Sequence, residues 1–335
     1  MQKGLVSILT PCYNTGSIVH RLLDSILAQD YPSIEMFAIN DGSTDNTEEV
    51  IKSYIPWFEA KGYSLTYIYQ TNQGQSAAIN NGLKLVNGEF LCWPDSDDFF
   101  RVHNALTMYV DALKGCDNNY GIVRCYPVYV EENTLEETEM NLRPAYRDEN
   151  QFENCLNSEN FIWGAGNYLI RTSTFDKVNP TRTIYVEKDA GQNWQLLLPM
   201  LYSYKCLTIE KSVFCVLVRP NSHSRGQYKT YEQLYAKINS YCNTIVATLD
   251  TINSMPEEER LSYKRQIQIK YKMQELGLAF KYKKSEEKKR IIDELDSMGV
   301  NVPLIYTFKL WLKYTKIGKC LSWLHIQLHK LNHNL

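Results

Sequence analysis

The stretch Glu89-Phe90-Leu91-Cys92-Trp93-Pro94, followed at once by Asp95-Ser96-Asp97-Asp98, decides how the rest of the chain is interpreted. The apolar run closed by a proline is typical of a buried strand. Two carboxylates about 5 Å apart repel by roughly 3 kcal/mol at an effective dielectric constant of about 20, so a cluster in a crevice needs a compensating charge. Mg²⁺ and Mn²⁺ supply one, since they share one or two carboxylates with a substrate's phosphates. The alternative is a solvated acidic turn, or a cap on the next helix.

Strand and helix patterns alternate around this stretch. The hydrophobic spacing predicts strands at 5–10, 34–39, 65–69 and 89–93, with helices at 18–27, from Asp45 onward and at 75–86. This alternation predicts an α/β fold with a mostly parallel central sheet covered by helices. Ligands of such sheets bind beyond the carboxyl ends of the strands, which brings segments 11–14, 41 and 95–98 to one rim.

Composition and missing motifs exclude several protein classes. The 335 residues carry a net charge of −2, which gives no general reason to expect a nucleic-acid partner. The nine cysteines are scattered without a CxxC pair, which favours a reducing, cytoplasmic environment. The sequence shows no signal peptide and no stretch of 18 apolar residues. Residues 10–14 lack the glycine fingerprint of dinucleotide binders, and no P-loop is present, so neither a plain Rossmann dehydrogenase nor a P-loop NTPase is expected.

Four motifs in order resemble those of family 2 glycosyltransferases. They are Val6-Ser7-Ile8-Leu9-Thr10-Pro11-Cys12-Tyr13-Asn14, Asn40-Asp41-Gly42-Ser43-Thr44-Asp45, Asn72-Gln73-Gly74-Gln75-Ser76-Ala77-Ala78-Ile79-Asn80-Asn81-Gly82 and Asp95-Ser96-Asp97-Asp98. The resemblance extends over residues 4 to about 225 and is strongest up to residue 100. It implies the GT-A fold, a Rossmann-like architecture. Ile79 departs from the family pattern, because many relatives have arginine there.

The resemblance implies roles at the matching positions. Asp41 would accept a hydrogen bond from the nucleobase, and Tyr13 would lie against the base. Asp97 would hold Mn²⁺ or Mg²⁺ on the donor diphosphate, Asp95 would contact the ribose or the metal's water shell, and Asp98 would orient its catalytic neighbours. The alternatives are that Tyr13 only packs and that Asp41 only forms an Asx-turn with the glycine after it. The other donor-binding positions are Pro11, Asn14, Gly74, Asn80 and Ser96.

The acceptor side is expected in the second half of the same domain. Residues 161–170, which include Trp163 and Gly164, resemble the strand that forms the floor of the acceptor site, and Trp194 follows nearby. Relatives commonly have Glu-Asp-Trp where this chain has Gln192-Asn193-Trp194. An amide cannot accept a proton at neutral pH, so Asn193 cannot be the general base.

Three explanations for this departure remain. Asp189 or Glu187 reaches the site, another group removes the proton, or the transferase is impaired. We expect Asp189 to be the base; the alternative is that it caps the helix containing Trp194.

The end of the domain offers further candidates. A strand pair or one long strand is predicted at 207–218. The resemblance implies that His223 completes the metal shell. Arg219 or Arg225 could brace the diphosphate. The alternative for a histidine in a polar loop is simple solvation. Between the first half of the domain and the acceptor segment we expect a helix at 102–113, a strand at 121–130 and a solvated loop at 131–160. The alternative for 131–160 is a flap on the acceptor side, which no particular residue supports.

From about residue 229 to 335 the pattern is helical, with helix starts near Pro256 and Ser285 and an end at Gly299. The segment 304–331 interleaves tryptophans and lysines without an acidic residue, as in basic amphipathic helices that contact anionic membranes. The alternative is a terminal helix docked on the domain. We therefore expect a GT-A domain at 1–228, divided into a nucleotide half (1–100) and an acceptor half (101–228), and a helical C-terminal region.

The function that this resemblance implies is metal-dependent, inverting transfer of a hexosyl or N-acetylhexosaminyl group. The donor would be a nucleotide sugar, with UDP expected, and the acceptor a hydroxyl of a glycan or lipid-linked oligosaccharide in polysaccharide biosynthesis. The protein would be cytoplasmic, and at the cytoplasmic face of the membrane if the tail binds lipid. The alternative, suggested by Asn193, is a non-catalytic nucleotide-sugar-binding subunit of a polysaccharide assembly complex.

Overall fold

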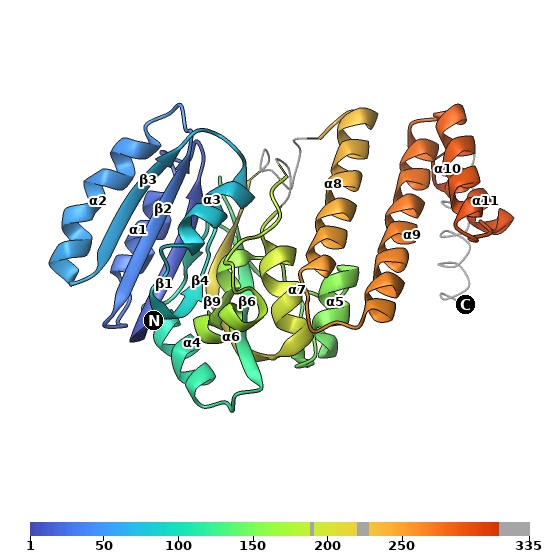
Figure 1. Cartoon of the computed structure of the whole chain (residues 1–335). Helices are drawn as coiled ribbons and strands as arrows, with labels where there is room; N and C mark the ends of the chain where they lie inside the picture. The colour runs from blue at the N-terminus through green and yellow to red at the C-terminus, as the bar shows by residue number, and fades with distance from the viewer. Residues whose placement is uncertain (188–190, 220–227, 315–335) are drawn as a thin grey trace, which may run out of the picture. The chain divides into compact units, whose positions relative to one another are not determined.

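The computed structural model of the chain describes residues 1–187, 191–219 and 228–314 (Figure 1). The chain divides into two compact units. The first comprises residues 1–226 and 244–256, and the second comprises residues 227–243 and 257–335.

The first unit begins with four parallel strands in the order β3-β2-β1-β4. Their bounds are Gln2–Cys12 for β1, Ile34–Asp41 for β2, Ser64–Gln70 for β3 and Gly88–Cys92 for β4. In the register, Cys12 pairs with Asn40 and Asp41 pairs with Gln70. Because the strands are parallel, their carboxyl ends meet at one edge of the sheet, which is where the sequence places the motif residues.

Helices cover this part of the sheet (Figure 1). α1 (His20–Leu27) buries Leu22, Leu23 and Ile26 in the main core, and α2 (Thr47–Lys61), α3 (Gln75–Leu83) and α4 (Ala105–Lys114) follow in the chain. α2 begins two residues after Asp45. The Asp45 carboxylate accepts hydrogen bonds from the N–H groups of Thr47 and Gly16, both at 3.0 Å, and so joins the helix start to the loop after β1.

The second half of the sheet is mixed. β8 (Tyr168–Arg171) lies antiparallel between β4 and β6 (Tyr120–Glu131), while β9 (Lys205–Val218) runs parallel to β6. Two short strands, β5 (Phe99–Phe100) and β7 (Glu137–Glu139), are antiparallel to β9 and β6. The described residues thus form one nine-stranded sheet, which confirms the α/β fold class and adds antiparallel strands to the expected parallel ones.

The stretch 131–160, expected to be a solvated loop, contains structured elements. Beside β7 it forms the 3-10 helix η1 (Pro144–Arg147) and α5 (Phe152–Asn157), which buries Phe152, Cys155 and Leu156. The expectation of a loop was wrong for this stretch, because three buried apolar residues in one short helix are enough to anchor the segment to the core. The remaining elements of this half are η2 (Ala165–Asn167), α6 (Thr172–Val178) and α7 (Asn193–Ser203).

Four helices follow in the part of the chain that the structure describes, and α8 (Tyr231–Asp250) runs from the second unit into the first. α9 (Glu257–Lys281), α10 (Ser285–Ser297) and α11 (Leu304–Tyr314) belong to the second unit, whose own core includes Leu276, Ile291 and Leu295. Gly299 adopts a φ of +73° just after α10, as the sequence predicts for a helix end. Among the described helices, none combines the length and apolar character needed to cross a bilayer.

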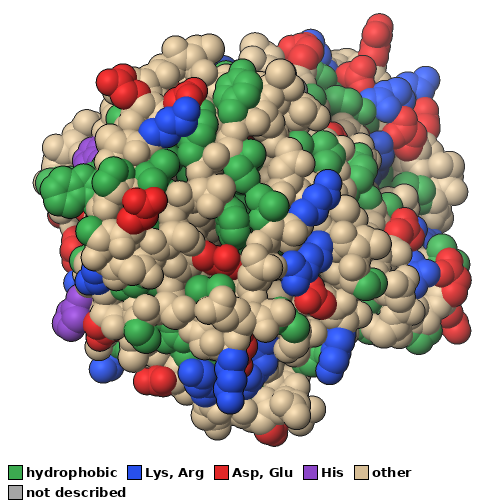
Figure 2. Space-filling model, turned by 60° about the vertical axis from the view of Figure 1, so that its left-hand side comes forward, with side chains coloured by type: hydrophobic (Ala, Val, Ile, Leu, Met, Phe, Trp, Pro, Cys, Tyr) green, Lys and Arg blue, Asp and Glu red, His purple; other side chains and the backbone are tan. Residues whose placement is uncertain are grey.

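One face of the molecule carries acidic and basic side chains interspersed with hydrophobic ones (Figure 2). This mixture agrees with the nearly balanced totals of 36 Lys and Arg against 38 Asp and Glu.

Candidate active site

The acidic turn after β4 is held between two strands of the sheet. The Asp98 N–H donates to the Asp95 carbonyl at 3.2 Å, which closes the turn. Asp98 is only 3% exposed, and its Oδ1 accepts the Leu217 N–H at 2.8 Å. β5 then pairs with β9 directly after the turn, so the end of β9 is fixed beside the carboxylates.

Burial changes the acidity of this turn. Burial and the neighbouring charges of Asp97 and Asp95 raise the pKa of Asp98 well above its ordinary value. Burial, followed by the charge of Asp97, raises the pKa of Asp95 to about 7, although the amides of Gln192 and Gln75 oppose the shift. The turn is therefore not fully ionised at neutral pH, and a cation bound there would favour ionisation.

A cationic side chain already faces the turn. Arg219, just beyond β9, places Nη2 at 2.8 Å from Oδ2 of Asp97. Nε of the same guanidinium is buried and has no hydrogen-bond partner among the described residues. Arg219 thus reduces the repulsion within the acidic turn and keeps one buried donor unused.

Asp41 organises the neighbouring loop. The side chain is 4% exposed, and its carboxylate accepts three hydrogen bonds: from Gln70 Nε2 at 2.7 Å, from the Gln73 N–H at 2.9 Å and from the Gly74 N–H at 2.9 Å. Gly74 has a φ of +92°, a conformation that favours glycine, and α3 starts directly after it. Asp41 thereby sets where α3 begins.

The start of α3 joins Asp41 to the acidic turn. Gln75, one residue after the glycine bound to Asp41, donates from Nε2 to Oδ1 of Asp95 at 2.8 Å. The expectation that the ends of β2 and β4 meet at one rim is thus realised by residues 73–75, which touch both carboxylates.

The loop after β1 supplies the other side of this rim. Asn14 has a φ of +51°, its N–H donates to Ser43 Oγ at 2.9 Å, and its Oδ1 accepts the Thr44 N–H at 2.8 Å. Tyr13, beside it, is 51% exposed. Pro11 is buried in β1, and Ser96 is buried beside the thiol of Cys12. Of the four expected donor-binding residues in this region, Asn14 binds the neighbouring loop and Tyr13 leaves its ring accessible.

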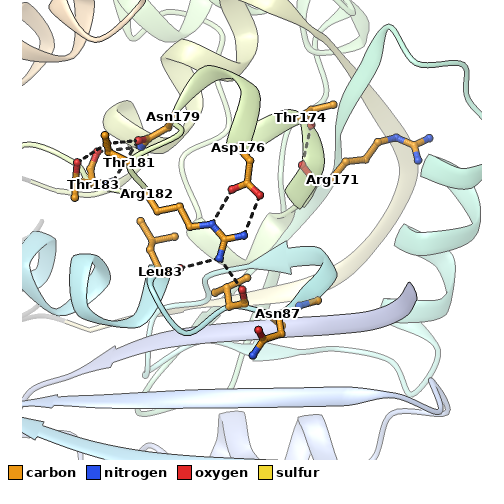
Figure 3. A network of polar contacts seen from close by, with 12 residues as sticks. Leu83, Asn87, Arg171, Thr174, Asp176, Asn179, Thr181, Arg182 and Thr183 are labelled. Atoms are coloured by element: carbon orange, nitrogen blue, oxygen red, sulfur yellow. Dashed lines mark hydrogen bonds and ion pairs between the residues drawn. The ribbon is translucent and has the colours of Figure 1, made fainter. Parts of the chain in front are cut away.

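Asn80 contacts protein backbone. Its Nδ2 donates to the Ile184 carbonyl at 2.9 Å, and its Oδ1 accepts the Ile184 N–H at 2.7 Å. Close by, Arg182 forms a two-pronged ion pair with Asp176, at 2.7 and 2.9 Å, and donates to the Val86 carbonyl at 2.6 Å (Figure 3). These bonds attach the segment after α6 to the end of α3. The sequence analysis did not identify Arg182, because this residue is not part of any recognised motif.

Trp163 and Trp194, which the sequence analysis expects on the acceptor side, pack against each other. Their rings meet edge to face with centroids 4.9 Å apart, and the Trp194 indole N–H donates to the Cys155 carbonyl at 3.2 Å. Trp194 is buried, whereas Trp163 is partly exposed. Of the two rings, that of Trp163 is therefore the more accessible.

The glycines near Trp163 are required by packing. A Cβ on Gly164 would lie 2.1 Å from Nδ2 of Asn167, and one on Gly166 would lie 2.0 Å from the ring of Phe214. The small residues of this segment therefore have a structural reason independent of any sugar.

Two amides at the start of α7 hold this region together. Asn193 donates from Nδ2 to the Trp163 carbonyl at 3.0 Å and accepts the Trp93 indole N–H at 3.2 Å. Gln192 is buried and donates from Nε2 to Oδ1 of Asp95 at 3.0 Å, while its Oε1 has no hydrogen-bond partner in the described part of the chain. Carboxylates could not make either donation.

The role of Gln192 was missed in the sequence analysis, although its amide at a position usually occupied by glutamate was a usable signal. Asp189, the expected base, lies outside the described residues, as do His223 and Arg225. Glu187, the other carboxylate considered, accepts the Tyr185 hydroxyl at 3.2 Å.

The oxygen ligands at the rim suit a divalent cation that also binds the phosphates of a ligand. Asp97 and Asp95 offer carboxylate oxygens, which Mg²⁺ and Mn²⁺ prefer. Within residues 1–187, 191–219 and 228–314, no three His, Cys, Asp or Glu side chains are grouped to hold a metal ion. A cation here would need further ligands from a bound diphosphate.

Residues 7–175 match the family described as Glycosyl transferase family 2. The chain belongs to this family. An uncharacterised glycosyltransferase of Rickettsia typhi is 37% identical over 121 residues, which cover 36% of each chain. EpsJ of Bacillus subtilis, also an uncharacterised glycosyltransferase, is 27% identical over 179 residues, covering 52% of this chain and 50% of EpsJ. The aligned part of this family 2 member thus spans a third to a half of those relatives.

Solved structures share the fold of this family 2 chain. TarS of S. aureus, in a complex with UDP-GlcNAc, superposes with a TM-score of 0.56 at 19% identity and covers 92% of this chain and 79% of its own. The mannosyltransferase PcManGT of Pyrobaculum calidifontis, in complex with GDP-Man and Mn²⁺, gives a TM-score of 0.52 at 16% identity. The superposition covers 98% of this chain and 85% of PcManGT. The GT-A type of α/β fold with a helical extension is confirmed.

Proposed function

We propose that this protein is a metal-dependent, inverting glycosyltransferase that moves a sugar from a nucleotide-sugar donor, expected to be a UDP-sugar, to a hydroxyl of a glycan or lipid-linked acceptor. The observation that carries the proposal is the rim itself. Asp41, Asp95, Asp97 and Arg219 converge there, joined by the start of α3 and by the ion pair to β9. TarS, which has a similar fold, binds UDP-GlcNAc in its crystal structure, and this supports the donor class.

The nucleotide would be selected by Asp41. A carboxylate has about four acceptor positions, and three are occupied by Gln70, Gln73 and Gly74. One acceptor position remains for an N–H of a uracil-type base. The exposed ring of Tyr13 could cover the face of that base.

The diphosphate would be held at the acidic turn. A bound Mn²⁺ or Mg²⁺ would supply positive charge that stabilises the leaving diphosphate. The residues that would hold it are Asp97 and Asp95, together with His223 in the proposed assignment. Arg219 adds a guanidinium that would donate to a phosphate oxygen in exchange for part of its bond to Asp97.

In the proposed reaction the acceptor hydroxyl attacks the anomeric carbon from the side opposite the diphosphate. The bond from that carbon to the diphosphate oxygen breaks, and the configuration inverts. The hydroxyl proton passes to a carboxylate, which we assign to Asp189. Trp163 and Gly164, at the partly exposed end of the tryptophan pair, would face the acceptor.

Calorimetry with UDP and Mn²⁺, followed by a panel of UDP-sugars assayed for UDP release, tests this proposal. We expect UDP to bind only weakly without the metal, and Asp97→Ala to remove the metal-dependent part. Absence of manganese-assisted UDP binding would overturn the proposal.

The second candidate is a non-catalytic nucleotide-sugar-binding subunit of a polysaccharide assembly complex. It is favoured by Asn193, whose amide makes two structural hydrogen bonds where a base is usual. This candidate predicts metal-dependent UDP binding without hydrolysis or transfer of any UDP-sugar, so the same two measurements distinguish it from the enzyme.

A further inference from the structure

The last described helix, α11, is only partly covered by its own unit. It packs through Leu310, with Tyr306 and Tyr314 adding partly buried contacts to the core of the second unit. These residues recur every four positions, so they define one narrow face of the helix. Among the described residues, no other side chain of α11 belongs to that core.

The opposite face of α11 is apolar and exposed. Leu304 is 87% exposed, Ile305 60%, Phe308 51% and Trp311 39%, and the rings of Phe308 and Trp311 stack with centroids 5.9 Å apart. Leu304, Phe308 and Trp311 follow the i, i+4, i+7 spacing of one helix face. Four large apolar side chains gathered on one face are more than scattered surface hydrophobics, and they indicate an interaction site.

The charged residues of this C-terminal segment indicate which kind of partner would bind the exposed face. Lys309 and Lys313 are both exposed on the same helix. From residue 304 to 335 the sequence has no Asp or Glu and five lysines, whereas the whole chain has slightly more acidic than basic residues. The partner surface should therefore be apolar beneath and negatively charged at its boundary.

We propose that the exposed face of α11 binds an anionic lipid surface. Leu304, Phe308 and Trp311 would enter the boundary between headgroups and acyl chains, and Lys309 and Lys313 would contact headgroup phosphates. Two other occupants fit less well. A second copy would bring its own Lys309 and Lys313 against the first pair, and residues 315–335 would add three more lysines to the same boundary.

This inference is independent of the transferase proposal, and vesicle sedimentation of the full chain tests it. We expect the protein to sediment with phosphatidylcholine vesicles that contain phosphatidylglycerol, and much less with phosphatidylcholine alone. Leu304→Gln combined with Phe308→Gln should reduce the partition coefficient by about tenfold or more, because two large side chains no longer enter the bilayer. Lys309→Gln combined with Lys313→Gln should also reduce it, by about thirtyfold, because two lysines no longer attract the anionic headgroups.

Matched controls come from elsewhere on the surface. Trp57→Gln with Leu261→Gln removes two exposed apolar side chains, and Lys3→Gln with Lys61→Gln removes two exposed charges. Both controls should sediment like the wild type. UDP binding measured without vesicles should be the same in all variants, which separates this test from that of the proposed function.

Three results would overturn the proposal. Equal binding to both vesicle types would exclude the anionic partner. A wild-type dimer that the Leu304 and Phe308 variant converts to monomer would assign the face to a second copy. A clear fall in melting temperature in that same variant would show that the chain covers the face itself.

Discussion

Arg219 and Asp97 form an ion pair across the rim of the sheet, with Nη2 of the arginine 2.8 Å from Oδ2 of the aspartate. The two residues follow different strands, and the pairing of β5 with β9 brings them together. In the proposed function Arg219 would supply positive charge to the diphosphate, and its partner Asp97 would hold the metal. Binding of a donor would require the guanidinium to exchange part of its bond to Asp97 for a phosphate oxygen.

Arg219→Gln is predicted to weaken UDP binding in the presence of Mn²⁺ by about 10- to 100-fold, the value of one hydrogen bond to a charged group. Uridine, which has no phosphate, should bind equally to the variant and the wild type. Calorimetry with both ligands measures the difference. Arg147→Gln, which breaks an exposed ion pair with Glu210, is the matched control and should leave both affinities unchanged. Equal losses of UDP and uridine affinity would show that Arg219 only supports the fold.

The acidic turn predicts how the stability of the metal-free protein depends on pH. The pKa of Asp95 is raised from 3.8 to about 7, and that of buried Asp98 is also raised, in both cases chiefly by burial. At a pH between the ordinary and the raised pKa, these carboxyls are protonated in the folded protein and ionised in the unfolded chain. The folded protein therefore binds more protons, so the free energy of unfolding should fall as pH rises from about 4 to about 7. Urea denaturation in the presence of a chelator, repeated across this range, measures the slope.

Asp95→Asn identifies the residue responsible. An asparagine oxygen can still accept from Gln75 and Gln192, but it does not titrate. The variant should therefore lose part of the slope, and what remains should belong to Asp98. The same slope in variant and wild type would show that Asp95 is not the titrating group.

The first half of the fold could be predicted from sequence because local signals agree there. Apolar runs of strand length alternate with helical spacing up to residue 93, and a parallel sheet then places Asp41 and Asp95 at one edge without further information. The same reasoning could not find the antiparallel insertion of β8 between β4 and β6, since no local pattern encodes which distant strand is a neighbour.

Side-chain partners were harder to predict than positions. Asn80 was assigned to the donor from its motif, yet its amide binds both backbone groups of Ile184, more than a hundred residues away. Gly164 was assigned to the floor of the acceptor site, and the structure shows that close packing against Asn167 restricts this position, as packing against Phe214 restricts Gly166. Such contacts depend on tertiary packing, which residue type and spacing do not specify.

Gly166→Ala tests directly whether packing against Phe214 requires a glycine at this position. The new methyl group would lie 2.0 Å from the Phe214 ring, which is itself buried, so we expect a loss of about 1–3 kcal/mol in the free energy of unfolding. Gly191→Ala is the matched control, since no described residue beyond its chain neighbours has an atom within 4 Å of the added Cβ, and its stability should change by less than about 0.5 kcal/mol. Chemical denaturation compares the two. A neutral Gly166→Ala would mean that the segment shifts easily, and its glycine would then need a functional explanation.

The amide at position 193 leads to the last prediction. Asn193→Asp keeps the acceptor for the Trp93 indole but replaces the donor to the Trp163 carbonyl with a carboxylate oxygen. We expect a loss of about 1–3 kcal/mol in the free energy of unfolding, because two acceptors then face each other. The same change at the exposed Asn253 is the control and should be nearly neutral.

If Asp189 is the base, Asn193→Asp should not raise the turnover of a UDP-sugar, whereas Asp189→Asn should lower it by about two to four orders of magnitude with UDP affinity unchanged. Glu187→Gln removes the other candidate carboxylate, which accepts a hydrogen bond from the Tyr185 hydroxyl, and should leave turnover unchanged if Asp189 is the base. A gain of turnover in Asn193→Asp would instead locate the missing base at the start of α7, beside Trp163. In that case the wild-type Asn193 amide would stabilise the proposed acceptor site through its hydrogen bonds but could not act as a base. The non-catalytic nucleotide-sugar-binding subunit would then be the better description of this protein.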